Sequence, residues 1–176
     1  MHTKTVSRTK TLVIVALFVA LSLVGSQIRI FCTIAFDSLP GFLAALLLGP
    51  MAGAAIGFLG HFFTALTAGF PLSPPLHLVI AGSMAITMAG FGLTYRVLQG
   101  KFSQPVTLAV TGIVGLILNA PFSLACSIGA LAFLAGWEAA LGLVALLPAL
   151  VVASIANIAI SIILFQALAK VWDELL

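Results

Sequence analysis

Four charged or histidine side chains, with acid, base or ion-pairing chemistry, lie between residues 29 and 77 of this chain. Arg29 and Asp37 stand eight positions apart, and His61 and His77 follow in the next apolar segments. A carboxylate together with histidines can perform general acid–base chemistry, and the same groups can hydrogen-bond a ligand. Structural roles are open alternatives. Arg29 and Asp37 could pair and latch two helix ends together, and each histidine could bond a neighbouring carbonyl.

Two asparagines occupy the middle of two later apolar segments. Ser123 and Ser127 follow Asn119 by about one and two helical turns, and Ser154 precedes Asn157 by nearly one turn. Helices that run in opposite directions would turn these residues into two facing polar stripes. An amide in an apolar interior must find hydrogen-bond partners. We therefore predict Asn119, Ser123 and Asn157 as ligand-binding residues, with bonding of a serine to its own helix as the structural alternative.

Motifs for nucleotide hydrolysis, metal binding and nucleophilic catalysis are missing from the sequence. Gly100 and Lys101 are followed by Phe102 rather than by serine or threonine, so they do not form a phosphate-binding loop. There is no HExxH or GxSxG pattern, and Cys32 and Cys126 do not form a CxxC pair. No apolar segment carries a carboxylate pair, which coupled transporters commonly use. The sequence favours a protein that is not an enzyme and holds neither a metal nor a cofactor.

The composition requires that these groups be positioned in an apolar environment. Hydrophobic residues make up 62% of the 176 residues and charged residues 6%, whereas an ordinary soluble domain is about 45–50% apolar. We predict one all-α integral membrane domain over residues 1–176. The net charge is +3, but the cations flank apolar segments instead of sharing one face. This distribution favours an anionic lipid surface and argues against nucleic acid.

Glycine and proline clusters divide the chain into six apolar segments. A helix needs about 20 apolar residues to cross a bilayer core, and a shorter one can reach part of the depth when neighbours pack against it. The second segment is short. We predict spans at residues 11–30, 39–48, 51–69, 75–95, 105–130 and 141–170.

Six crossings would put both termini on the same side of the membrane. The positive-inside rule makes that side cytoplasmic, because only Arg29 then lies outside. Residues 28–38, 70–75 and 135–140 are expected on the outer face. Trp137 and Glu138 in the last of these loops could form a lid, while an interfacial anchor is the ordinary role for the tryptophan. The cations predicted on the cytoplasmic side are Lys4, Arg8, Lys10, Arg96, Lys101 and Lys170.

Small residues recur at helical spacing in two of the predicted spans. Gly49, Gly53 and Gly57 stand four positions apart in one, and Ala16 and Ala20 stand four apart in the first. Small residues on one helix face let another helix approach closely in lipid. We interpret the glycines as an internal packing face. For the alanines, packing within the protein and contact with a separate membrane subunit are both open.

One long segment resembles the substrate-binding S component of energy-coupling factor (ECF) vitamin transporters. Residues 36–61 read FDSLPGFLAALLLGPMAGAAIGFLGH, a short leucine-rich helix that ends in Gly-Pro before a glycine-spaced helix. The small size, the six predicted spans and the alanines of the first span extend the resemblance over the whole chain. Val24 departs from it, since a third small residue would be expected there. FDSLP together with GHFFTALTAGFPL at residues 60–72 looks like the branch that takes up α-ribazole, a cobalamin precursor.

The resemblance implies a high-affinity vitamin-binding subunit in the plasma membrane of a prokaryote. It would dock through Ala16 and Ala20 onto a transmembrane coupling subunit driven by two cytoplasmic ATPases, and topple to release its substrate inside. The implied pocket lies near the outer surface, where the polar residues described above are expected. The substrate would be α-ribazole or another vitamin or nucleoside precursor, such as riboflavin or pantothenate.

Two other classes of protein are open alternatives. A small polytopic membrane enzyme using His61, His77 and Asp37 would need these groups at one depth, whereas the predicted spans put His61 mid-membrane and Asp37 at the outer surface. An oligomeric channel would need a polar stripe from face to face, and the inner halves of the predicted helices are apolar.

Overall fold

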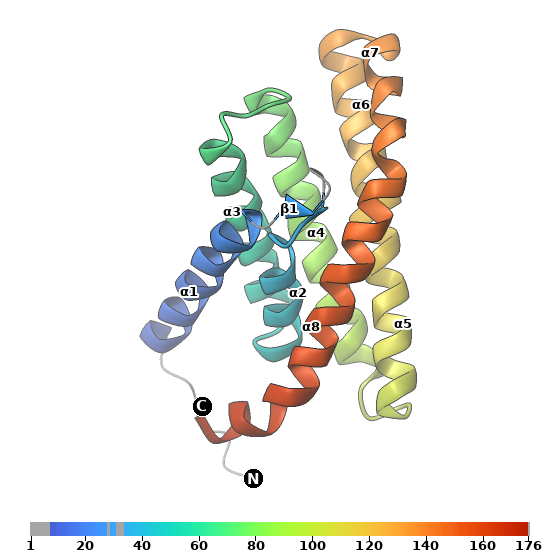
Figure 1. The fold of residues 1–176 in the computed structure, drawn as a ribbon. Coiled ribbons are helices and arrows are strands. Elements are labelled where there is room, and N and C mark those ends of the chain that lie inside the picture. Colours follow the sequence, from blue (N-terminus) through green and yellow to red (C-terminus); the bar gives the residue numbers. More distant parts are fainter. Residues whose placement is uncertain (1–7, 28, 31–33, 176) are drawn as a thin grey trace.

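The computed structural model describes residues 8–27, 29–30 and 34–175, and nearly all of them are helical (Figure 1). Two-residue strands, β1 (Arg29–Ile30) and β2 (Ile34–Ala35), pair antiparallel between the first two helices. The helices are α1 (Arg8–Gln27), α2 (Leu39–Leu47), α3 (Pro50–Thr67), α4 (Pro74–Leu98), α5 (Gln104–Ile117), the π-helix η1 (Leu118–Phe122), α6 (Ser123–Ala135), α7 (Trp137–Leu141), the 3₁₀-helix η2 (Gly142–Leu146) and α8 (Leu147–Leu175).

Proline and glycine set most of the helix boundaries, as the sequence predicts. Helices α2, α3, α4 and α5 each carry proline in their first two positions, where its missing N–H costs no helical hydrogen bond. The hydroxyl of Ser73 also caps α4 by accepting a bond from the backbone N–H of Leu76 at 3.4 Å. Gly49 and Gly136 adopt φ angles of 107° and 89° between helices, a region that side chains disfavour.

In the part of the chain that the structure describes, five helical stretches are long and apolar enough to cross a membrane, one fewer than predicted. The difference is α2, whose nine residues extend about 14 Å against a hydrocarbon core of roughly 30 Å. The predicted turn at 135–140 also contains α7, so helical structure resumes at Trp137. The five stretches are Arg8–Gln27, Pro50–Thr67, Pro74–Leu98, Gln104–Ala135 and Trp137–Ala169.

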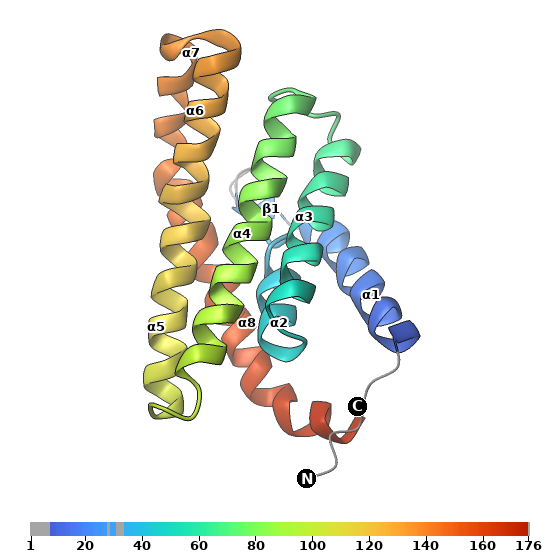
Figure 2. The same cartoon turned by 180° about the vertical axis from the view of Figure 1, so that it is seen from behind.

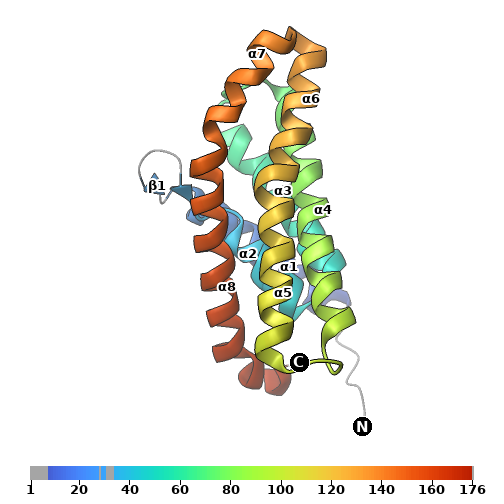
Figure 3. The same cartoon turned by 90° about the vertical axis from the view of Figure 1, so that its right-hand side faces the viewer.

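The long helices surround α2. Helix α3 lies between α1 and α4 (Figure 2), and the rod made by α5, η1 and α6 lies between α4 and α8 (Figure 3). The start of α1 and the end of α8 lie towards the same end of the bundle as the α4–α5 connection, opposite the α3–α4 loop and α7 (Figure 1). Helix α2 contacts α1, α3, α4 and α8, and every residue from Pro40 to Leu46 is buried.

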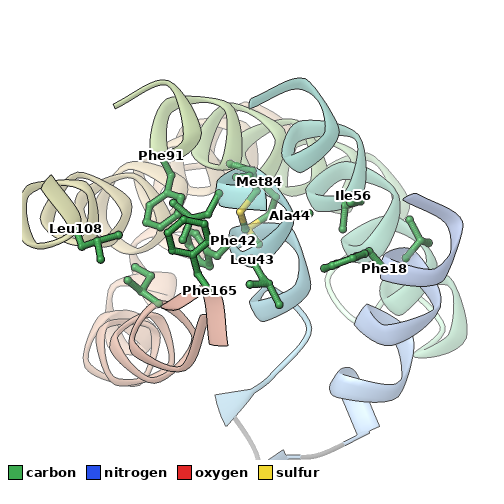
Figure 4. Close-up of a cluster of buried hydrophobic side chains, with 14 residues drawn as sticks. Phe18, Phe42, Leu43, Ala44, Ile56, Met84, Phe91, Leu108 and Phe165 are labelled. Atoms are coloured by element: carbon green, nitrogen blue, oxygen red, sulfur yellow. The ribbon is translucent and has the colours of Figure 1, made fainter. Parts of the chain in front are cut away.

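The hydrophobic core is built around α2 (Figure 4). Phe42 is fully buried and its ring meets that of Phe91 edge-on, with the centroids 4.9 Å apart. Met88 and Ile56 are also fully buried in this cluster. A helix too short to span the membrane is therefore held in place by side-chain packing on all sides.

The glycine face of α3 packs inside the protein. A Cβ at Gly53 would lie 2.6 Å from the Cβ of Ala45 on α2, and a Cβ at Gly60 would lie 2.8 Å from the Cβ of Ser22 on α1. Side-chain carbons do not approach so closely. Helix α3 can contact both of its neighbours at this distance only because these positions lack side chains.

Candidate functional site

A cavity of about 180 Å³ lies where the segment just before α2 meets α3, α4, η1, α6 and α8. Polar side chains come from five of these regions, and aliphatic or thioether side chains from α4 and α8 complete the wall. The lining residues are Asp37, Ser38, His61, Ile80, Met84, Asn119, Ser123, Leu150, Ala153, Ser154 and Asn157.

The end of α1 holds the segment that brings Asp37 to the cavity. The backbone N–H of Phe36 donates to the carbonyl of Gly25 at 3.2 Å. A Cβ at Gly25 would collide with the Phe36 carbonyl, so this close crossing requires glycine. Ser38 then precedes α2, and its carbonyl accepts a bond from the N–H of Phe42 at 3.1 Å. Asp37 is thus placed by backbone contacts at both sides.

Asp37, His61 and His77 form a chain of contacts across three segments. The His61 Nδ1 atom lies 3.9 Å from an Asp37 carboxylate oxygen, and its Nε2 atom lies 3.2 Å from Nδ1 of His77. The two imidazole rings are tilted by 30°. The expectation that His61 and Asp37 lie at different depths is therefore wrong. His61 faces the cavity, and His77 is buried behind it.

Asn119 and Ser123 face the cavity from neighbouring turns. The Asn119 amide nitrogen donates to the Ser154 hydroxyl at 2.7 Å, and its buried Oδ1 atom has no hydrogen-bond partner among the described residues. The Ser123 and Ser83 hydroxyls are 2.7 Å apart. Ser83 donates its own hydrogen to the Ile80 carbonyl, so Ser123 must be the donor in that pair. Ser123 therefore keeps an acceptor oxygen, and the Asn119 Oδ1 atom is an unpaired acceptor buried within the cavity wall.

The wall contributed by α8 follows helical spacing. Leu150, Ala153 and Asn157 lie three and four positions apart and share one face with Ser154. The Asn157 amide nitrogen donates to the Ala153 carbonyl at 2.8 Å. The hydrogen bond between Asn119 and Ser154 shows that the polar stripes expected on the fifth and sixth predicted spans meet across the bundle. Ser127, by contrast, bonds the Ser123 carbonyl of its own helix.

The predicted binding residues separate into three groups. His77 reaches the cavity only through His61, and the side chain of Arg29 lies outside the described residues, as does its predicted pairing with Asp37. Trp137 is 66% exposed at the start of α7 and does not line the cavity. The predicted residues that line the cavity are Asp37, His61, Asn119, Ser123 and Asn157.

Sequence reasoning did not select several lining residues. Ser38 is adjacent to Asp37, and Ile80 and Met84 are four positions apart on α4, so neighbourhood and helical spacing were available as signals. Nothing in the sequence distinguishes these two from ordinary core residues. Within the described ranges, no three His, Cys, Asp or Glu side chains are placed to hold a metal ion, and Cys32 lies outside those ranges.

The alanines of α1 lie on its outer face. Ala16 and Ala20 are exposed, while Phe18 and Ser22 on the opposite face are buried against the bundle. Packing of these two alanines within the described part of the chain is therefore not observed. Leu17, between them in sequence, is 59% exposed, so the face is apolar and free to contact lipid or another membrane helix.

Comparison with known proteins identifies the chain by family. The model of the family "ECF transporter, substrate-specific component" matches residues 10–169. A search of curated proteins and a search of solved structures each gave no match. Members of this family are subunits of transporters and not enzymes. With its apolar helices, this multi-pass membrane protein belongs to the family of ECF transporter substrate-specific components, which bind a small molecule and work with an ECF module of a transmembrane subunit and ATPases.

Proposed function

We propose that this chain captures an uncharged aromatic nucleoside, α-ribazole, for an ECF importer, and that the cavity between α2, α3, α4, α6 and α8 is its binding site. The observation that carries the proposal is the polarity of the cavity wall: Asp37 and Ser123 offer hydrogen-bond acceptors there, and the buried Oδ1 atom of Asn119 in the same wall has no partner among the described residues. A ligand that satisfies them must bring hydrogen-bond donors. The hydroxyls of a ribose are such donors.

Charge narrows the class of ligand further. In the described part of the chain, the residues lining the cavity include a carboxylate and neither lysine nor arginine. A phosphate or carboxylate on the ligand would be desolvated near Asp37 without a cation to compensate it. This argues against nucleotides and against pantothenate, which carries a carboxylate.

The apolar part of the wall suits a compact aromatic ring. Ile80, Met84 and Leu150 contribute side chains to the cavity, and methionine packs well against ring edges. The volume of about 180 Å³ is below the roughly 300–1,000 Å³ of pockets for drug-sized ligands. The bicyclic base of α-ribazole requires less widening of this site than the tricyclic ring of riboflavin, and the sequence resemblance favours the same substrate.

The partner surface belongs to the same proposal. The exposed face with Ala16 and Ala20 would dock on the transmembrane coupling subunit, because small side chains let a partner helix approach closely. Both termini would lie in the cytoplasm of a prokaryotic cell, with the protein in the plasma membrane. A channel is disfavoured because Phe42, Met88 and Phe91, all fully buried, fill the bundle one to two turns beyond the cavity.

Thermal unfolding in detergent with a panel of compounds tests the proposed substrate. The panel contains α-ribazole, α-ribazole 5′-phosphate, riboflavin and pantothenate. A ligand at 100 times its Kd adds about 2.7 kcal/mol to the free energy of unfolding, so a binder raises the Tm clearly. We expect a shift with α-ribazole and none with its phosphate. Equal Tm shifts with α-ribazole and its phosphate would refute the argument that the cavity excludes anionic ligands. A Tm shift with riboflavin alone would mean that riboflavin, and not α-ribazole, is the substrate.

A further inference from the structure

The rod between α4 and α8 contains one turn of π-helix. Residues Leu118–Phe122 form η1, with Pro121 inside it, and α5 and α6 continue on either side. Proline lacks an N–H and its ring disturbs the preceding turn of an α-helix, so it breaks the regular ladder. A π-turn accommodates one additional residue and changes which side chains face a neighbour. Here the turn carries Asn119 and leads directly to Ser123.

Helix α4 binds this turn at its start. Thr87 is completely buried, and its hydroxyl donates to the carbonyl of Leu118 at 3.1 Å. The bond joins two segments 31 residues apart in sequence. It reaches a backbone carbonyl in the part of the helix where the regular bonding pattern is interrupted. Thr87 itself is not among the residues that line the cavity.

Helix α4 also binds the residue just after the turn. Ser83 lies four positions before Thr87, hence on the same face of α4, and its hydroxyl accepts the bond from Ser123 at 2.7 Å. Ser83 is 3% exposed and does not line the cavity either. Two hydroxyls of α4 thus hold the two ends of the π-turn, and Asn119 lies between the two points of attachment.

We propose that Thr87 and Ser83 are positioning residues for the binding site: by holding the π-turn Leu118–Phe122 they fix the direction in which Asn119 presents its side chain to the substrate. The inference rests on the proposed function, since it assumes that the cavity is the substrate site. The second anchor of Asn119 is the bond from its amide nitrogen to Ser154. With the backbone held by α4 and the amide nitrogen held by α8, the direction of the Asn119 side chain is set before the ligand arrives.

Removal of one hydroxyl tests the role of Thr87. Thr87→Val keeps the shape and loses the bond to Leu118, and Thr87→Ser keeps the bond. Thr111→Val is the matched control, because Thr111 is equally buried but bonds a carbonyl of its own helix. We expect Thr87→Val to raise the Kd for α-ribazole about tenfold, Thr87→Ser to restore it, and Thr111→Val to leave it unchanged. Equal effects of Thr87→Val and Thr111→Val would overturn the proposal.

A double-variant cycle separates positioning from general destabilisation. Asn119→Ala should itself raise the Kd about tenfold. If Thr87 acts through Asn119, adding Thr87→Val to Asn119→Ala changes the Kd less than about threefold; independent effects would multiply to about a hundredfold and would overturn the proposal.

Hydrogen exchange of the protein without ligand provides a readout that does not depend on the substrate. Thr87→Val should accelerate amide exchange in residues 118–124, and Thr111→Val should not. If wild-type protein fails to bind α-ribazole, the proposed substrate is wrong. The exchange result still shows whether Thr87 restrains the π-turn. Unchanged exchange in Thr87→Val would refute the role given to this residue.

Discussion

The close contact between α2 and α3 gives a prediction that isolates packing from helix propensity. Gly53→Ala would put a Cβ 2.6 Å from the Cβ of Ala45 and 2.9 Å from its Cα. The second atom is backbone, so the clash cannot be relieved by rotating a side chain. Gly82→Ala on α4 is the matched control, because no atom lies within 4 Å of the position where its Cβ would be.

The difference in stability between these two variants measures the contact. Both substitutions gain about 1 kcal/mol from the better helix propensity of alanine, so this contribution cancels. Overpacking of a tight core contact costs about 1–3 kcal/mol. For a chain of this size that corresponds to a Tm for Gly53→Ala roughly 2–12 °C below the Tm for Gly82→Ala. Thermal unfolding of both proteins in the same detergent, followed by intrinsic fluorescence, measures the difference.

Two results would refute the reasoning. Equal melting temperatures would mean that α2 and α3 separate at no cost, and that glycine is not needed at their contact. A lower melting temperature for Gly82→Ala than for Gly53→Ala would mean that the tight site lies on α4 instead. A lower Tm for Gly53→Ala than for Gly82→Ala, both without and with ligand, would support internal packing as the role of Gly53.

Three further predictions concern the outer face of α1, the cavity and the core. Leucine at both Ala16 and Ala20 should prevent copurification of the coupling subunit and ATPases while the Tm stays within about 2 °C, because both side chains are exposed; retained copurification would place the docking surface elsewhere. Asp37→Asn should weaken α-ribazole binding about tenfold, since a charged acceptor is stronger than a neutral one, whereas calorimetry on Glu138→Gln should show no change. Phe42→Ala should lower the free energy of unfolding by about 3–5 kcal/mol, and a loss below 1 kcal/mol in denaturant unfolding would contradict its central place in the core.

The helix boundaries could be read from the sequence because proline and glycine act locally. Gly49, Gly136 and the prolines at the starts of α2 to α5 all stand at helix ends. The number of membrane-crossing helices could not be read in the same way. The stretch of α2 is as apolar as a span, and its enclosure by other helices is seen only in its contacts with α1, α3, α4 and α8.

The position of Asp37 relative to His61 was predicted wrongly, because depth was inferred from the number of residues between Asp37 and the predicted spans. The strands β1 and β2 pair antiparallel, with Arg29 opposite Ala35, and the N–H of Phe36 bonds the carbonyl of Gly25. The chain therefore returns beside the last turns of α1 instead of continuing outward, and Asp37 reaches the level of His61. The bond between Phe36 and the last turns of α1 is a tertiary contact, and a hydropathy pattern does not predict such contacts.

The polar stripes of the last two spans were partly predictable. Helical spacing placed Asn119 and Asn157 on the inward faces, and the structure brings both to one cavity. The π-turn at Pro121 was not predicted, because proline in an apolar segment indicates a kink without specifying how the backbone is rearranged. The hydroxyls of Ser83 and Thr87 look in sequence like ordinary buried residues of a membrane helix.

The short helix α2 also bears on how the chain is made. A segment of nine residues cannot remain stably in a bilayer on its own, since it leaves backbone ends at the hydrocarbon core. It gains its full cover only from contacts with α8, which is synthesised after the other helices described above. Until α8 has been synthesised, α2 should remain near the membrane surface or be shielded by insertion machinery. The core would then close only after α8 has been made, and chains stalled before residue 147 should be substrates for membrane quality-control proteases.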